Sequence, residues 1–121
     1  MGWSVSAQLL TLAVMASTSA ARLDEMIEEA TVDCYNDSEQ VCGLFTLLDE
    51  ALAVPFETTV LGATVTVESI ELTFDDQIMA VCVHGDTRQL VRILDLTLPN
   101  PPPDGAEWID AYRRWAKHTG T

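Results

Sequence analysis

Residues 31–57 have the sequence TVDCYNDSEQVCGLFTLLDEALAVPFE, and the rest of the chain is arranged around them. Residues 36–38 are Asn, Asp and Ser, whose side chains accept hydrogen bonds from the free N–H groups that open a helix. The helix is predicted to run to about Ala53. Pro55 ends the segment, because the residue before a proline disfavours helical geometry. The stretch is therefore predicted to be an acidic corner followed by a helix.

An earlier helix is predicted for residues 22–36, with one apolar face and one acidic face. The second helix has its own apolar stripe at helical spacing, made of Val41, Leu44, Phe45, Leu48 and Leu52. Gly43 inside this helix costs about 1 kcal/mol relative to alanine. A glycine at this place indicates that another backbone packs close, and the first helix is the neighbour that we expect.

From Phe56 the pattern changes to β. Thr58–Val67, Ile78–Val83 and Gln89–Leu94 are rich in apolar and β-branched residues. Gly62, Asp75-Asp76 and Gly85-Asp86 break this pattern, and the last two are signals for tight hairpin turns. Four or five short antiparallel strands of this kind predict a small, partly closed barrel or a strongly bent sheet.

The end of the chain has a different composition. Residues 99–103 are predicted to form a rigid extended linker, because three of them are consecutive prolines. Beyond it, Trp108, Ile109, Tyr112 and Trp115 fall at helical spacing and are expected to dock on the body. Basic residues near the end of this helix suit its dipole, and an acidic face elsewhere in the chain is their expected contact. We divide the chain into an extension or leader-like segment (1–21), a main domain (22–98) and a tail (99–121).

Acidic residues dominate the charge balance. The 121 residues include 19 Asp or Glu and 6 Lys or Arg, which gives a net charge of −13. Such a surface repels nucleic acids and anionic lipid and attracts cations, so neither nucleic acid nor membrane is an expected partner. Solubility or adaptation to salt is an alternative reason for the overall excess. We expect a monomer.

The compartment is predicted from two observations. Three cysteines without a CxxC pair are typical of free thiols in a reducing compartment. Residues 7–16 form an apolar run that weakly resembles a secretory signal, but no Lys or Arg precedes it. A cytoplasmic location is therefore expected, and secretion is the alternative.

Clustered carboxylates are the strongest candidates for chemistry. Asp33, Asp37 and Glu39 lie at the corner, within seven residues, and Asp49, Glu50 and Glu57 lie around the end of the second helix. Calcium prefers six to eight such oxygens. A 14-residue helix spans about 21 Å, so one ion cannot touch both groups. Either there are two sites, or one group is structural, with the corner residues serving only as helix caps.

Other site types have little support. The spacing of an EF-hand loop is absent, because the third residue from Asp33 is Tyr35 and the sixth from Asp37 is Cys42. Cys34 and His84 are a conceivable nucleophile and base, but nothing in their spacing supports such a pair. No catalysis is expected. The alternative to calcium binding is a metal-free acidic interaction module that meets a basic protein partner.

The order of residues resembles a known family. The matching elements are Val32-Asp33-Cys34-Tyr35, Glu39-Gln40, Gly43, Leu47-Leu48-Asp49-Glu50 and Val54-Pro55-Phe56. Together they are similar to the core of the small acidic, non-EF-hand calcium-binding proteins of cyanobacterial type. The resemblance covers about residues 22–98, and the extension and the tail depart from it.

This resemblance implies an α+β fold, in which an N-terminal helix pair packs on a small antiparallel SH3-like or barrel-like β unit. A short C-terminal helix follows in this chain. It also implies Ca²⁺ held by carboxylates that are discontinuous in sequence, with a buffer or sensor role. The acids that match the family are Asp33, Glu39, Asp49 and Glu50; Asp37 stands where the family often has an acid, and Glu57 is a looser match.

Overall fold

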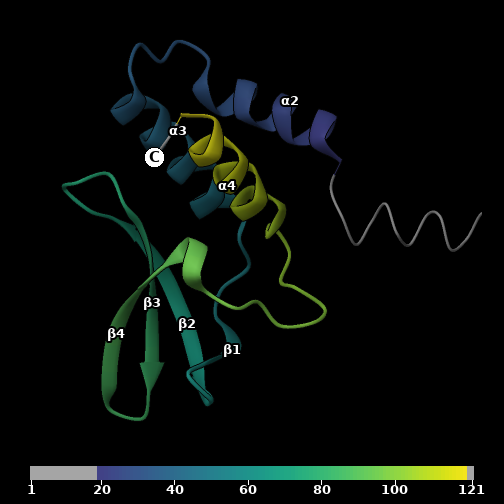
Figure 1. The fold of residues 1–121 in the computed structure, drawn as a ribbon. Coiled ribbons are helices and arrows are strands. Elements are labelled where there is room, and N and C mark those ends of the chain that lie inside the picture. Colours follow the sequence, from purple (N-terminus) through teal and green to yellow (C-terminus); the bar gives the residue numbers. More distant parts are fainter. Residues whose placement is uncertain (1–18, 120–121) are drawn as a thin grey trace, which may run out of the picture.

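The computed structural model describes residues 19–119, in which three helices lie over one end of a four-stranded sheet (Figure 1). The α+β class with a helix pair, a small antiparallel sheet and a C-terminal helix is confirmed. The predicted extension, residues 1–21, lies almost wholly outside the described residues. The elements in chain order are α2 (Ala20–Thr31), α3 (Asp37–Ala51), β1 (Phe56–Val60), β2 (Ala63–Leu72), β3 (Ile78–His84), β4 (Thr87–Arg92), the 3₁₀ helix η1 (Ile93–Asp95) and α4 (Glu107–Thr119).

The corner between α2 and α3 is tighter than the periodicity predicted. Helix α2 ends at Thr31 and not near Asn36, and Asp33 takes a positive φ of 65°. Asn36 is the N-cap of α3, and its side chain accepts a hydrogen bond from the Glu39 N–H at 2.9 Å. The predicted cap is therefore confirmed, and the five residues between the helices turn the chain.

Helices α2 and α3 touch through their backbones at Gly43. A Cβ atom built on Gly43 would lie 2.1 Å from the carbonyl oxygen of Ala30. Any side chain larger than hydrogen would force the helices apart. This contact confirms the expectation that a neighbouring backbone explains the glycine.

The sheet is an antiparallel meander with strand order β1-β2-β3-β4. Strands β1 and β4 are its two edges, so the described strands form an open sheet. The register shifts between Val67 and Ser69, which is typical of a bulge that bends the sheet. Strand β4 ends at Arg92, two residues before the predicted end, because Ile93 turns into η1 and is buried.

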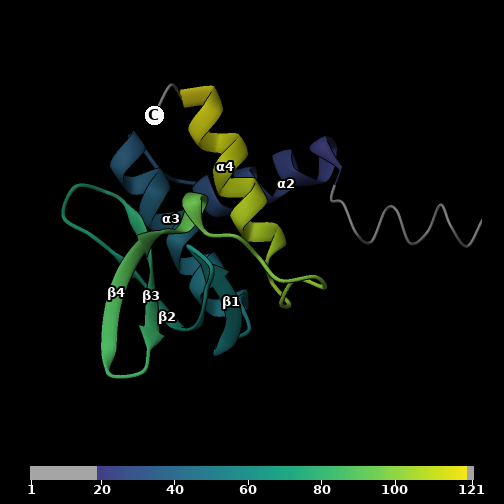
Figure 2. The same ribbon diagram turned by 60° about the horizontal axis from the view of Figure 1, so that its bottom comes forward.

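Helix α4 packs against both α2 and α3 (Figure 2). Its predicted face is buried, and Trp115 donates a hydrogen bond from Nε1 to Gln40 Oε1 at 2.7 Å. Arg114 makes two hydrogen bonds to Asp24, at 2.7 and 3.2 Å, which confirms the expected contact between the basic end of this helix and an acidic face. The hydrogen bond from Arg114 lowers the pKa of Asp24, and this ion pair joins α4 to α2.

The segment before α4 returns to the end of α3. Ala53 donates its N–H to the Asp104 carbonyl at 2.8 Å, and the Thr58 hydroxyl donates to the Thr97 carbonyl. Gly105 has a φ of 88°, and a Cβ there would lie 2.2 Å from the Ala51 carbonyl oxygen. The tail is thus attached closely to the exit of α3. No helix within residues 19–119 has the length and apolar character needed to cross a membrane.

Candidate metal centre

At the corner, Glu39 already has a structural task. Its Oε2 accepts a hydrogen bond from the Tyr35 N–H at 2.7 Å, while Asn36 Oδ1 accepts one from the Glu39 N–H. This reciprocal arrangement is close to a capping box. One Glu39 oxygen is therefore used to hold the corner, and Asp33 and Asp37 are exposed beside it.

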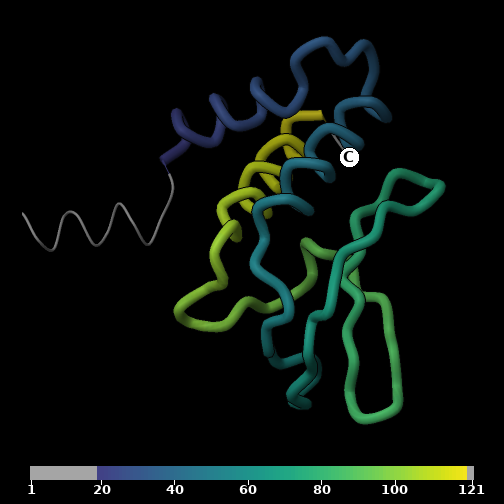
Figure 3. The backbone as a smooth tube through the Cα atoms, turned by 180° about the vertical axis from the view of Figure 1, so that it is seen from behind, coloured from purple at the N-terminus to yellow at the C-terminus, as the bar shows by residue number. Residues whose placement is uncertain are grey.

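The turn between β2 and β3 comes to the same place. Ser38 in the first turn of α3 donates a hydrogen bond to Asp76 Oδ1 at 3.1 Å, across 38 positions of sequence. Within the turn, Thr73 donates from its hydroxyl to Asp75, and the Gln77 N–H donates to the Thr73 hydroxyl at 3.0 Å. Figure 3 shows this turn rising toward the start of α3.

The corner and the turn together form an acidic end of the molecule. We call it the acidic end, and its carboxylates are those of Asp33, Asp37, Glu39, Asp75 and Asp76. From the sequence, the first three were predicted to be ligands, whereas Asp75 and Asp76 were predicted only to form a turn. No local signal joins them to the corner, because the approach depends on how the sheet packs under α3.

The donor chemistry at the acidic end suits a hard cation. All the side chains offer oxygen atoms, from carboxylates and from the Ser38 hydroxyl, as calcium requires. The start of α3 also places free N–H groups and a positive dipole there, which favours the carboxylates themselves. Within residues 19–119, however, no three His, Cys, Asp or Glu side chains converge as they would around a metal. A bound ion would therefore require these exposed side chains to turn toward one another.

The second predicted group lies elsewhere. Helix α3 has 15 residues and is about 22 Å long, so Asp49 and Glu50 in its last turns are remote from the acidic end. Both are exposed, as is Glu57 on β1. The structure separates the two predicted groups, as the helix length required, and within the described residues Glu57 belongs to no group of three His, Cys, Asp or Glu side chains that could hold a metal.

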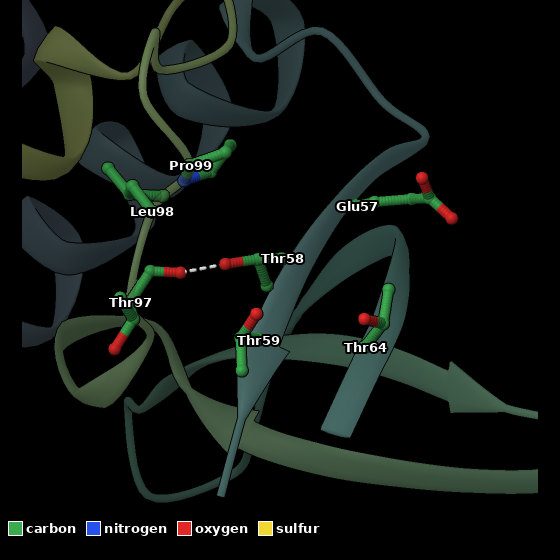
Figure 4. Close-up of a pocket in the computed structure, with 7 residues that line it drawn as sticks. All are labelled: Glu57, Thr58, Thr59, Thr64, Thr97, Leu98 and Pro99. Atoms are coloured by element: carbon green, nitrogen blue, oxygen red, sulfur yellow. Dashed lines mark hydrogen bonds between the residues drawn. The ribbon is translucent and has the colours of Figure 1, made fainter. Parts of the chain in front are cut away.

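Glu57 borders a groove of about 220 Å³ between β1, β2 and the segment after η1. In Figure 4 its carboxylate points away from Thr97, Leu98 and Pro99 on the other side of the groove. The remaining lining is made mostly of threonine side chains. The groove therefore has neutral hydroxyl groups and no converging charge.

Cys34 and His84, the conceivable nucleophile and base, lie far apart in the structure. Cys34 lies at the corner, where its thiol is 3.5 Å from the Glu39 carbonyl oxygen. His84 ends β3 at the far end of the sheet, and its Nδ1 lies 2.9 Å from the Thr64 carbonyl oxygen (Figure 1). This nucleophile and base cannot act together.

Comparison with known proteins identifies the fold. No protein-family model matches the sequence, and no curated protein matches it. The crystal structure of Anabaena CcbP matches with a TM-score of 0.68 and 20% identity, over 83% of this chain and 93% of that one. A calcium binding protein, solved in its calcium-binding form, matches with a TM-score of 0.66 and 19% identity, over 81% of this chain and 91% of that one.

These two matches show that the chain has the fold of such proteins. The likeness covers more of the chain than residues 22–98, on which the sequence resemblance was noted. The whole arrangement of helices and sheet is thus shared at low sequence identity. The fold implied by the resemblance is confirmed on independent, structural grounds.

Proposed function

We propose that this chain binds calcium through carboxylates that are discontinuous in sequence, as a buffer or sensor without catalytic activity. The observation that carries the proposal is the hydrogen bond from Ser38 to Asp76, which places two acidic segments together at the start of α3. The fold it shares with a calcium binding protein supports the same function. A cytoplasmic location stays a prediction.

The first proposed site uses Asp33, Asp37 and Glu39 together with Asp75 and Asp76. These carboxylates carry the same charge, in a chain of net charge −13, so bringing them together is unfavourable without a cation. When bound, calcium would offset this repulsion and supply a positive centre that several oxygens can share. Ser38 and Glu39 contribute by holding the corner and the turn in place before any ion arrives.

The second proposed site uses Asp49, Glu50 and Glu57, and it has less support from the geometry. The C-terminal end of a helix has a negative dipole, which disfavours two adjacent carboxylates. A cation would relieve this repulsion, but the ligands would have to include backbone carbonyl groups at the end of α3. We expect the second site to be weaker than the first.

Calcium titration of the full chain, followed by calorimetry and amide NMR, tests the proposal. Asp37→Asn/Asp76→Asn is expected to weaken binding at least tenfold, which is about 1.4 kcal/mol. Asp49→Asn/Glu50→Gln should leave the stronger binding step unchanged. Glu28→Gln/Glu29→Gln on the exposed face of α2 removes the same charge and serves as the control.

Thermal unfolding gives a second measurement. An ion that binds only the folded state at a free concentration of 100 times its Kd stabilises it by about 2.7 kcal/mol. The melting temperature should therefore be higher in calcium than in chelator. An equal rise with magnesium or sodium, or equal losses of affinity in the corner and control variants, would refute a defined calcium site.

The alternative function is a metal-free interaction module with a basic partner. It is supported by the sequence of the acidic end, since residues 31–52 and 72–83 contain no Lys, Arg or His. A chain that binds a basic protein through charge alone would do so equally in chelator and in calcium. The monomeric state expected from the sequence remains part of both hypotheses.

A further inference from the structure

Large apolar side chains are exposed at the acidic end. Phe74 in the β2–β3 turn is fully exposed, Tyr35 at the corner is 90% exposed, and Val32 beside it is 66% exposed. By contrast, the aromatic rings of α4 are buried in the core. Exposed aromatic groups that support no packing commonly mark surfaces that bind other molecules.

The segments that carry the two exposed rings are both hydrogen-bonded to the first turn of α3. Tyr35 is tied to α3 by the hydrogen bond from its N–H to Glu39, and the turn that carries Phe74 is tied to α3 by the hydrogen bond between Ser38 and Asp76. Arg92 donates to Gln77 at the base of the hairpin and lines a hollow together with Asp75.

We propose that this surface docks a basic amphipathic segment of a partner protein. Lys and Arg side chains of the partner would pair with the carboxylates, and its apolar side chains would cover Tyr35 and Phe74. Aromatic residues contribute strongly to such interfaces, and a cation over an aromatic face adds to the attraction. The proposal goes beyond calcium binding, because it assigns the exposed rings a task that ion ligation does not need.

The charge of the surface excludes two other occupants. A second copy seated on the same patch would place carboxylates against carboxylates, in a chain whose net charge is −13. An anionic membrane would be repelled for the same reason. A cationic peptide is the occupant that both the charge and the exposed rings fit.

The test uses the full chain in chelator, so that calcium plays no part. The probes are two labelled 18-residue peptides of equal charge, one an amphipathic Leu/Lys helix and the other a Ser/Lys peptide. The Leu/Lys peptide is expected to bind about tenfold more tightly, which is about 1.4 kcal/mol, because its leucine side chains can cover the exposed rings. Tyr35→Ser/Phe74→Ser should remove that advantage.

Leu61 provides the matched control. It is fully exposed in the β1–β2 turn, at the opposite end of the ten-residue strand β2 from Phe74 and about 33 Å away along it. Leu61→Ser should leave both affinities unchanged. Asp75→Asn/Asp76→Asn should weaken both peptides and reduce the salt dependence, whereas Asp86→Asn in the distant β3–β4 turn should have a much smaller effect.

Three results would overturn the proposal. These are equal affinity for the two peptides, an equal effect of Leu61→Ser and Tyr35→Ser/Phe74→Ser, and amide shifts centred on the acidic face of α2. The proposed calcium function is tested separately, because Tyr35→Ser/Phe74→Ser leaves every carboxylate in place and should keep calcium affinity. Either proposal can therefore fail while the other stands.

Discussion

The two ends of α3 carry similar acidic residues in different surroundings. At its start, Asp37 and Glu39 meet free N–H groups, a favourable dipole and a second acidic segment brought by the β2–β3 turn. At its end, Asp49 and Glu50 are exposed next to the place where Gly105, just before α4, packs against the Ala51 backbone. The comparison shows that residues of the same type lie in different surroundings at the two ends of one helix, because of helix polarity and of the turn that approaches one end.

The largest expected effect comes from disturbing the backbone contact between α2 and α3. Gly43→Ala should destabilise the fold by about 3 kcal/mol, because the new Cβ would overlap the Ala30 carbonyl oxygen and this outweighs the gain in helix propensity. Urea unfolding measures the loss. Cys42→Ala, at the exposed neighbouring position, is the control and should change stability little. A stable Gly43→Ala protein would show that α2 and α3 can separate without cost.

Removal of the cap should have a smaller effect at the same end of α3. Asn36→Ala deprives the Glu39 N–H of its acceptor and is expected to cost about 1 kcal/mol. Asn36→Ser keeps an acceptor oxygen and should recover most of this loss. Faster hydrogen exchange of the first amides of α3 should accompany the alanine variant. Equal stability of the alanine and serine variants would contradict the capping role.

Helix polarity can be tested with one substitution made in two places. Glu50→Gln near the end of α3 should stabilise the fold by about 0.5 kcal/mol, because a carboxylate there opposes the dipole. Glu107→Gln in the first turn of α4 should destabilise it by a similar amount. Thermal unfolding at low ionic strength measures both, and high salt should shrink both. Shifts of the same sign would show that net charge, and not helix polarity, decides the outcome.

The smallest effect concerns Asp24, which belongs to neither acidic group. The hydrogen bond from Arg114 lowers its pKa below the ordinary value of 3.8, so the unfolded chain binds a proton more readily than the folded one. This contribution to stability is present above about pH 3.8 and is lost as the pH falls through the lowered value. The exposed position keeps it small.

Urea unfolding at pH values between 2 and 6 checks this pair. Wild type should exceed Asp24→Asn in stability at pH 6, and the difference should vanish at the acid end of the range. Arg22 and Glu25 form a more exposed pair on the same helix at 3.5 Å, so Glu25→Gln removes the same charge and is the control. A constant difference between wild type and Asp24→Asn at all pH values would contradict the assignment.

Much of the fold was predictable because its signals are local. Asn36 as a cap and Asp75-Asp76 as a turn depend on side chains that act on the backbone within a few residues, and a glycine inside a helix indicated a close contact by the side chain it lacks. The apolar stripe of α4 likewise predicted its buried face. The errors were at element ends, as where Asp33 turns with a positive φ, because periodicity continues past the residue at which a helix stops.

The candidate site was predictable only in part. Asp33, Asp37 and Glu39 are close in sequence, so their grouping follows from the chain itself, and the length of α3 separates them from Asp49 and Glu50. The part played by Asp76 does not follow, because it approaches Ser38 across 38 residues. The exposure of Phe74 is equally hidden, since an apolar residue next to a turn is as compatible with a core position.

Local chemistry along the chain thus accounts for the helices, the turns and the acidic corner. Which acidic segments meet, and which aromatic rings face solvent, was decided when the sheet packed beneath α2, α3 and α4. The physical reason is that capping and periodicity involve neighbouring residues, whereas the approach of the β2–β3 turn to α3 depends on burying one shared apolar core. That packing decides which carboxylates lie near one another on the surface of the folded chain.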